Sequence, residues 1–386
     1  MALVASRQSM LFLSRVSLFR NSLNCNGVRV VQYCIHNSNN PKVEKSERKR
    51  VVFDLKPLVI EKKNPNAPNK YEVKVLTDWQ KFLKSLPKPL HPYIDASRLD
   101  KPTGTLLLLW PCYWSVALAT KAESFPDPSL IALFGLGAVF MRSAGVIVND
   151  LLDKEFDKQH PRTKDRAIAS GALSRTDALM LLSGHLGAAL LVALQFDFNT
   201  ILLTTSSLGL VFTYPLMKRI TYWPQLVLGM TFNWGALVGW SAVTGGQLYL
   251  PAVLPLYAAG ICWTLVYDTI YAHQDREDDL KLGVKSTAIR FGDSTKKWLA
   301  CFSAGMISNL VLVGVNTQQT WPYYLALLGI SAELGNMIYK LNINDKKDCW
   351  NKFAKNTYIG FYICAGIIVS TMIKKKDKTT EKKSEV

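Results

Sequence analysis

Long apolar segments alternate with short polar connections over most of the chain. Stretches such as Leu106–Ala119 and Ala178–Leu194 contain no Asp, Glu, Lys or Arg and have no broad polar face, which disfavours a soluble helical bundle. The apolar segments approach the roughly 20 residues that an α-helix needs to cross a bilayer. The pattern therefore predicts an all-α, polytopic membrane bundle of about nine transmembrane helices. They are expected near 103–121, 129–149, 177–195, 199–216, 223–243, 250–270, 296–316, 320–340 and 355–373.

Basic residues lie in alternate connections between the predicted spans. Those on one side contain a single basic residue, Lys121, and are Lys121–Ser129, Gln195–Asn199, Thr244–Tyr249 and Asn316–Thr320. Those on the other side carry Lys154, Lys158, Arg162, Lys164, Arg166, Arg175, Lys218, Arg219, Arg276, Lys281, Lys285, Arg290, Lys296, Lys297, Lys346, Lys347 and Lys352. This alternation matches the positive-inside bias and predicts a single orientation for the bundle. The Lys374–Lys383 tail is an exception, since nine spans place it on the opposite side.

The first segment has the composition of an organelle-targeting signal. Residues 1–43 contain no Asp or Glu, and four arginines recur there among serines and aliphatic residues. An Arg-rich, Ser-rich and acid-free segment is typical of a mitochondrial transit peptide. We therefore predict a transit peptide over 1–43, a polar arm over 44–97, a transmembrane domain over 98–374 and a charged tail over 375–386. The predicted location is the mitochondrial inner membrane, with the basic loops facing the matrix.

The net charge of +17 is compatible with nucleic acid, a membrane surface or an anionic substrate. A nucleic-acid partner is disfavoured because the positive charges lie in alternate loops rather than in one soluble domain. The lipid bilayer is the expected surroundings of the apolar segments.

A first cluster of acidic residues follows the second predicted span. It reads Asn149-Asp150-Leu-Leu-Asp153-Lys-Glu155-Phe-Asp157. If the helix continues outward, Asn149, Asp150, Asp153 and Asp157 fall within an arc of roughly 100°. Carboxylates at the mouth of a membrane bundle usually mark an ion or substrate path.

A second acidic cluster follows the sixth predicted span, on the same basic side. Asp268, Asp275 and Asp279 would fall within roughly 40° of one another if that helix also continues. Mg²⁺ keeps octahedral oxygen coordination and usually takes one or two carboxylates together with substrate phosphates. Two facing clusters would therefore bind a diphosphate through bridging Mg²⁺ ions. The alternative is two solvated loops in which the aspartates cap helices.

Basic side chains near these clusters suit direct contact with phosphate oxygens. They are Arg162, Lys164, Arg166, Lys218 and Arg219.

Arg142 lies within an apolar run, about two helical turns before Asn149 and on the same face. A buried arginine needs an anionic partner. That partner is either an internal aspartate or the carboxylate of a substrate, and position alone favours neither.

The two acidic motifs resemble the paired aspartate motifs of the UbiA superfamily of intramembrane prenyltransferases. They are Asn149-Asp150-x-x-Asp153-x-x-x-Asp157 and Tyr267-Asp268-x-x-Tyr271-Ala-x-x-Asp275-x-x-x-Asp279. Four further segments resemble the ubiquinone-pathway branch of that family, and the likeness covers about residues 95–370. These are Arg98-Leu-Asp100-Lys-Pro102-x-Gly104, Met141-Arg142-Ser-Ala-Gly145, Tyr214-Pro215-Leu-Met-Lys218-Arg219-x-Thr221 and Trp223-Pro224-Gln225. One departure is Ala167, where relatives usually carry proline, which affects loop geometry more than charge.

The resemblance implies nine transmembrane helices around a central cavity, and transfer of a polyprenyl group from polyprenyl diphosphate to 4-hydroxybenzoate. It implies that Mg²⁺ is held by Asn149, Asp153, Asp157, Asp268, Asp275 and Asp279, all but Asn149 of which would be catalytic. The substrates would contact Arg142, Asn149, Asp150, Arg162, Arg166, Lys218, Arg219 and Tyr271. Arg142 would bind the benzoate carboxylate, and Asp268 would accept the proton that the ring or phenol loses.

Two rival functions stay open at this stage. A related prenyltransferase would share the metal motifs but use another aromatic acceptor. A mitochondrial membrane carrier would also show basic loops and carboxylates within the membrane. The sequence indicates neither the prenyl chain length nor whether other ubiquinone-pathway enzymes associate with this one.

Overall fold

The structure is a computed structural model that describes residues 18–25, 28–35, 59–60, 73–74 and 76–375. The chain divides into two compact units, Met1–Val75 and Leu76–Val386. The second unit begins within the predicted arm, so the last part of that arm belongs to the same unit as the bundle.

The described part of the first unit consists of two antiparallel strand pairs. Strand β1 (Leu18–Cys25) pairs with β2 (Val28–Ile35), with Leu18 opposite Ile35. Strand β3 (Val59–Ile60) pairs with β4 (Val73–Lys74). The rest of the predicted transit peptide lies outside the described residues, as do residues 376–386 of the predicted tail.

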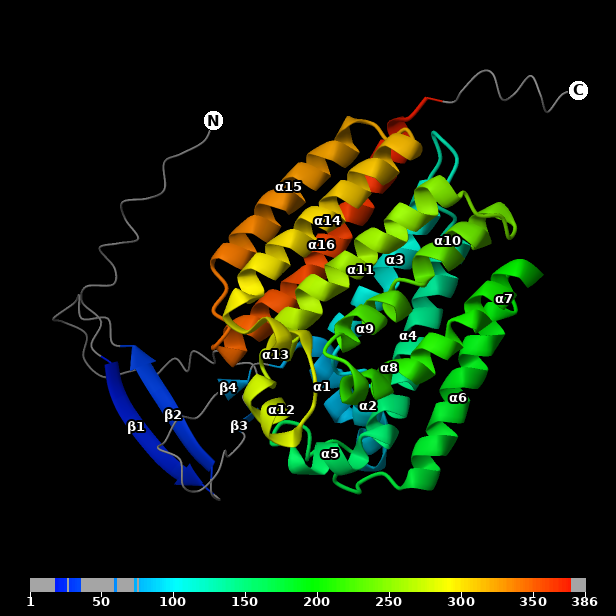
Figure 1. Cartoon of the computed structure of the whole chain (residues 1–386). Coiled ribbons are helices and arrows are strands. Elements are labelled where there is room, and N and C mark those ends of the chain that lie inside the picture. Colours follow the sequence, from blue (N-terminus) through cyan, green and yellow to red (C-terminus); the bar gives the residue numbers. More distant parts are fainter. Residues whose placement is uncertain (1–17, 26–27, 36–58, 61–72, 75, 376–386) are drawn as a thin grey trace, which may run out of the picture. The chain divides into compact units, whose positions relative to one another are not determined.

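The described part of the second unit is helical (Figure 1). Its α-helices are α1 (Asp78–Ser85), α2 (His91–Ala96), α3 (Thr103–Ala119), α4 (Pro128–Leu152), α5 (Lys154–Gln159), α6 (Arg175–Ala193), α7 (Phe198–Ser206), α8 (Leu208–Ile220), α9 (Pro224–Phe232), α10 (Gly235–Thr244), α11 (Leu250–Ala272), α12 (Arg276–Leu282), α13 (Thr287–Phe291), α14 (Thr295–Asn316), α15 (Trp321–Tyr339) and α16 (Lys346–Ile373). Its 3-10 helices are η2 (Lys88–Leu90) and η3 (Gly292–Ser294).

Each of the nine predicted spans corresponds to a helix or a broken pair of helices. In the described chain, seven of these segments are long and apolar enough to cross a membrane; α3 is a shorter apolar helix and α15 lies outside that set. Helix α16 begins at Lys346, earlier than the predicted 355, because its charged first turns are helical as well.

Two predicted spans are broken in the middle, which the apolar pattern did not indicate. Helices α7 and α8 meet at Ser207, and α9 and α10 meet at Asn233 and Trp234. At the second break the Asn233 amide donates to the Gly229 carbonyl (2.8 Å) and to the Thr264 hydroxyl (2.9 Å). A polar side chain that bonds the backbone in this way competes with the helical ladder.

The expectation that the two acidic helices continue outward is wrong. Helix α4 ends at Leu152 and the next residue, Asp153, leads directly into α5. Helix α11 ends at Ala272, and α12 starts after a three-residue turn that ends at Asp275. Each acidic cluster is therefore bent over the end of the bundle rather than carried on one straight helix.

Aromatic side chains form the centre of the bundle. The rings of Trp114 on α3 and Trp263 on α11 are both buried, with centroids 5.0 Å apart. Their indole N–H groups donate to the Gly360 carbonyl (2.8 Å) and to Asn356 Oδ1 (3.0 Å), both on α16. These bonds satisfy the polar edge of each ring, so the indoles can be buried without an unpaired donor.

The predicted alternation of basic loops is confirmed by where the loops meet. Lys218 at the end of α8 contacts Asp153 at the end of α4, and Lys346 at the start of α16 contacts Asp278 on α12. We call this end of the bundle the aspartate end. Figure 1 shows α5 and α12 there and the end of α16 at the opposite end. The last span therefore crosses the whole bundle, and α16 ends at Ile373, opposite to the aspartate end.

Candidate active site

The aspartates of the first acidic cluster are all paired with arginine or lysine side chains. Asp150 and Asp157 both contact Arg166, at 2.8 Å and 2.9 Å between Nη1 and the carboxylate oxygens. Asp153 is fully buried and pairs with Lys218 and, at 3.4 Å, with Arg219. The ends of α4, α5 and α8 thus lie together, because Asp153, between α4 and α5, pairs with the two cations at the end of α8. Asn149, which precedes these three aspartates in the sequence, lies on α4 and is half-buried.

The second cluster is only partly compensated. Asp275 is paired, whereas neither Asp268 nor Asp279 has a cation within 4.0 Å among residues 76–375. Gln225 lies beside the Asp268 carboxylate, and its Oε1 accepts the N–H of Thr287 at 3.0 Å. Burial and the neighbouring Asp275 carboxylate raise the pKa of Asp279 to about 7. A divalent cation would remove this excess of negative charge.

Arg162 joins the two clusters. Its Nε and Nη2 contact the two carboxylate oxygens of Asp275 at 2.7 Å and 2.6 Å, and Nη1 donates to the Tyr271 hydroxyl at 3.0 Å. The arginine follows α5 and the aspartate precedes α12, so this two-point contact brings both clusters to one place. Burial lowers the pKa of His160, whose neutral Nδ1 accepts the Arg162 N–H at 3.2 Å.

Every site residue predicted at the mouth of the bundle lies at the aspartate end. The sequence did not predict which residues these side chains contact. Two cations beside the clusters, Lys218 and Arg219, contact Asp153. Arg219 also lies over the ring of Phe156, 4.9 Å from its centre. Lys164, proposed for phosphate contact, makes no ion pair within the described chain.

The oxygen-rich composition of the two clusters suits Mg²⁺, which takes carboxylate and amide oxygens. In the described part of the chain no three His, Cys, Asp or Glu side chains already surround a common point. The residues fit the ion by chemistry, since Asp268 and Asp279 have no cation within 4.0 Å among residues 76–375 and their neighbours supply further oxygens. Binding of the ion would require Arg162 and Lys218 to release their carboxylates.

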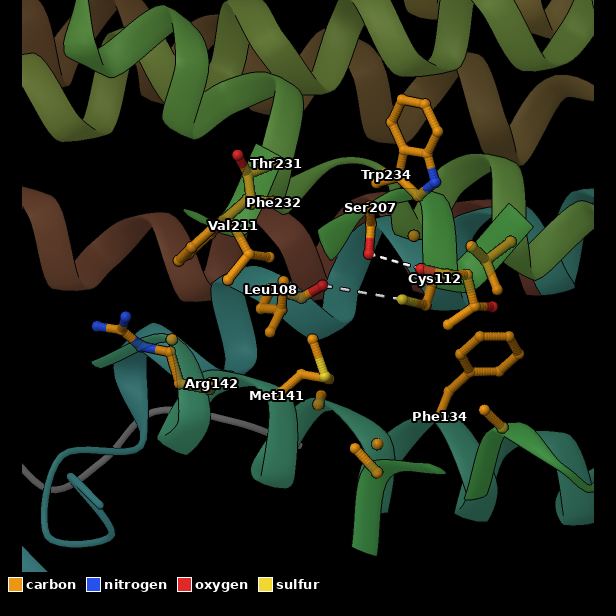
Figure 2. Close-up of a pocket in the computed structure, with 18 of the residues that line it drawn as sticks. Leu108, Cys112, Phe134, Met141, Arg142, Ser207, Val211, Thr231, Phe232 and Trp234 are labelled. Carbon is orange, nitrogen blue, oxygen red and sulfur yellow. Dashed lines mark hydrogen bonds between the residues drawn. The ribbon is translucent and has the colours of Figure 1, made fainter. Parts of the chain in front are cut away.

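A cavity of about 170 Å³ lies deeper in the bundle, between α3, α4, α6, α8 and α9 (Figure 2). Figure 2 shows Arg142 at one end of it and Phe134 further along α4. Most of its lining is apolar and includes Leu108, Cys112, Met141, Val211 and Phe232. Arg142 is the charged residue in this lining and is two helical turns from Asn149.

The guanidinium of Arg142 has no carboxylate within 4.0 Å among the described residues. It lies 5.6 Å from the centre of the Phe232 ring. It also packs against Gly104 so closely that a Cβ at position 104 would be 2.6 Å from its Nε. Of the two alternatives left open for Arg142, an internal pair with an aspartate is not formed among the described residues, and the side chain contacts an aromatic ring and a glycine instead.

Two residues of this region were not among the predicted site residues. Arg98 and Asp95 lie between α1 and α3, and Arg98 contacts Asp150 at 3.0 Å. The sequence signal was present, because Arg98 begins the Arg98-Leu-Asp100-Lys-Pro102 segment, but no pattern indicated its partner.

The fold and the site define a bundle of helices long and apolar enough to cross a membrane, with two carboxylate clusters at one end and an apolar cavity deeper inside. Comparison with known families matches residues 108–362 to the UbiA prenyltransferase family. The chain belongs to this family.

Several relatives are about half identical to this chain. The mitochondrial 4-hydroxybenzoate polyprenyltransferase of Drosophila melanogaster is 51% identical over 304 residues, which cover 79% of this chain and 77% of the relative. The protein of the same name from Homo sapiens is 52% identical over 298 residues, 76% of this chain and 80% of the relative.

Solved structures share the fold at lower sequence identity. The apo structure of a UbiA homolog from Aeropyrum pernix K1 has a TM-score of 0.60 and 23% identity, and the match covers 69% of this chain and 97% of that one. A UbiA homolog from Archaeoglobus fulgidus, bound to GPP and Mg²⁺, has a TM-score of 0.54 and 18% identity, with 73% and 99% covered.

Proposed function

We propose that this protein transfers a polyprenyl group from polyprenyl diphosphate to the ring of 4-hydroxybenzoate, at the carbon ortho to the hydroxyl, in ubiquinone biosynthesis. The observation that carries the proposal is the Arg162–Asp275 contact, which places both carboxylate clusters at one end of the bundle. The names of the relatives at about 50% identity support the donor and acceptor.

The proposed metal is Mg²⁺, held by Asn149, Asp153, Asp157, Asp268, Asp275 and Asp279. When bound, it neutralises charge on the diphosphate and so favours departure of that group. The binding of GPP and Mg²⁺ by the Archaeoglobus fulgidus homolog is consistent with this choice.

The basic side chains at the aspartate end would hold the leaving diphosphate. Arg162, Arg166, Lys218 and Arg219 are within reach of the clusters, and each now neutralises a carboxylate. Cleavage of the carbon–oxygen bond leaves an allylic cation and diphosphate. Fixed cations in a site with little water stabilise the charge that appears on the leaving oxygens.

Arg142 would bind the carboxylate of 4-hydroxybenzoate and decide which ring carbon faces the cation. Its guanidinium lines the cavity and has no internal carboxylate partner among the described residues. The ring carbon attacks the allylic carbon, and Asp268 accepts the proton that the ring then loses. Apolar lining around Arg142 would keep water away from the allylic cation.

The proposed location is the mitochondrial inner membrane, with the aspartate end facing the matrix. The basic loops gather at that end, and the relatives are named as mitochondrial. Residues 1–43 would act as the transit peptide.

The function is tested in membranes that contain the protein, with 4-hydroxybenzoate, a long polyprenyl diphosphate and Mg²⁺. We expect prenylated acid and diphosphate in equal amounts, and neither product in EDTA. Competing aromatic acceptors distinguish this enzyme from a prenyltransferase with another acceptor. A membrane carrier would release no diphosphate.

A further inference from the structure

Arg98 occupies a backbone position that favours glycine. Helix α2 ends in a Schellman motif, in which the Arg98 N–H donates to the Asp95 carbonyl (3.1 Å) and the Leu99 N–H donates to the Ile94 carbonyl (3.3 Å). Arg98 has a φ of 54°, the left-handed conformation in which a Cβ is crowded. Glycine would suit this turn better, so the arginine indicates that its side chain has a task at this position.

The side chain of Arg98 is directed into the protein. Nη2 contacts Oδ2 of Asp150 at 3.0 Å, and Nη1 contacts Oδ1 of Asp95 at 3.2 Å. Only 11% of the Arg98 side chain and 3% of the Asp150 side chain are exposed. A contact this deeply buried is screened little by water or salt.

Further contacts link Asp150 to Asp157, one of the proposed metal ligands. The other oxygen of Asp150, Oδ1, contacts Arg166 at 2.8 Å, and the same Nη1 of Arg166 contacts Asp157 at 2.9 Å. Asp95 makes a second contact with the segment that carries Arg166, because its Oδ2 accepts the N–H of Ala167 at 3.1 Å. Both oxygens of Asp150 are thus in use, and this aspartate bridges two arginines.

We propose that Arg98 is a positioning residue for the reaction. It fixes Asp150, Asp150 fixes the guanidinium of Arg166, and Arg166 in turn holds Asp157 in the orientation that metal and diphosphate need. The inference rests on the proposed function, since it assigns a task to the same site. It also reassigns Asp150, which becomes a bridge between arginines rather than a direct contact to substrate.

The turn itself suggests the test, because glycine keeps the backbone and removes the guanidinium. In Arg98→Gly we expect a folded protein whose kcat/KM for polyprenyl diphosphate falls about tenfold or more, as for other residues that orient metal ligands. The KM for 4-hydroxybenzoate should not change. Arg98→Ala should lose the same activity and also some thermal stability, because it keeps the strained backbone.

A binding measurement separates positioning from chemistry. Mg²⁺ with inorganic pyrophosphate should raise the thermal midpoint of the wild-type protein in detergent, and this rise should shrink in Arg98→Gly. Lys101→Ala is the matched control, since Lys101 is exposed, three residues away, and within the described chain pairs only with Asp100, at 3.5 Å. It should behave as wild type in both assays.

Each outcome decides the inference. Wild-type activity and a wild-type pyrophosphate response in Arg98→Gly would overturn it, and so would an Arg98→Gly protein that does not fold, because the side chain would then serve the fold. Asp95→Asn gives a second check and should show a smaller loss of the same kind. A wild-type protein without prenyl transfer would instead refute the proposed function, whatever the variants do.

Discussion

The charges of the first acidic cluster are paired within the protein, whereas the charge in the apolar cavity is not paired with a carboxylate among the described residues. At the aspartate end, Asp150, Asp153 and Asp157 are each paired with an arginine or lysine. In the cavity, Arg142 has no carboxylate within 4.0 Å in the described chain, and an aromatic ring and a glycine hold it instead.

The contrast shows where an external anion is needed. Charges that balance one another keep the helix ends in place and must exchange partners when a metal diphosphate arrives. A buried cation without an internal carboxylate is costly, and a substrate carboxylate would remove that cost. The first region is therefore expected to bind a strongly charged donor, and the second a small acid.

The largest effect is expected at Asp153. Asp153→Asn removes a fully buried carboxylate that contacts two cations and is a proposed metal ligand. Turnover should fall by about 10³-fold or more, about 4 kcal/mol in the transition state. Diphosphate release in membranes measures the loss. Glu155→Gln is the control on the adjoining helix, because Glu155 is exposed and, among the residues that the structure describes, pairs only with Lys158. Similar activities in both variants would contradict the site.

Arg142 should show the next largest effect, and on the acceptor only. Arg142→Ala removes the proposed partner of the benzoate carboxylate, so the KM for 4-hydroxybenzoate should rise about 10-fold to 100-fold, as for a lost charge-assisted hydrogen bond. The KM for the diphosphate should stay unchanged. A phenol without a carboxylate provides the control, since its slower reaction should not depend on Arg142. An equal loss with both acceptors would show that Arg142 serves the fold.

The unequal pairing of the two clusters predicts different stabilities for two isosteric variants without metal. Asp157→Asn weakens the contact with Arg166 and should destabilise by about 1–2 kcal/mol. Asp279→Asn removes a carboxylate that has no cation within 4.0 Å in the described chain and is crowded by Asp275, so stability should stay or rise at pH 8. Thermal unfolding in detergent with EDTA measures both. Equal losses would mean that the two clusters are equally compensated.

Much of this arrangement was predictable from residue patterns. Apolar length predicted the spans, and the alternation of basic loops predicted that both acidic clusters share one end. The ion pairs were not predictable, because several cations compete for each carboxylate and distance alone decides between them. Arg162, for example, contacts Asp275 across 113 positions of sequence and leaves the nearer Asp157 to Arg166.

The bends and backbone conformations near the site were also not predictable from the sequence. The bend after Leu152 depends on Lys218 and Arg219, which lie more than 60 residues away and hold Asp153. Arg98 illustrates the same limit, since nothing in its immediate sequence reveals a left-handed backbone or a partner on α4. Such features follow from packing between helices that are distant in sequence, and local sequence patterns do not indicate that packing.

The smallest effect expected is at Gly104, and it isolates how the cavity positions its cation. A Cβ at position 104 would lie 2.6 Å from Nε of Arg142, so Gly104→Ala must push the guanidinium aside. We expect the KM for 4-hydroxybenzoate to rise by about fivefold to tenfold, which corresponds to about 1 kcal/mol, the lower end of what overpacking costs. Gly187→Ala on α6 is the control, because a Cβ there would have no atom of another described element within 4 Å. If both alanines leave the KM unchanged, the close contact with Gly104 does not orient Arg142, and the aromatic ring of Phe232 alone must do so.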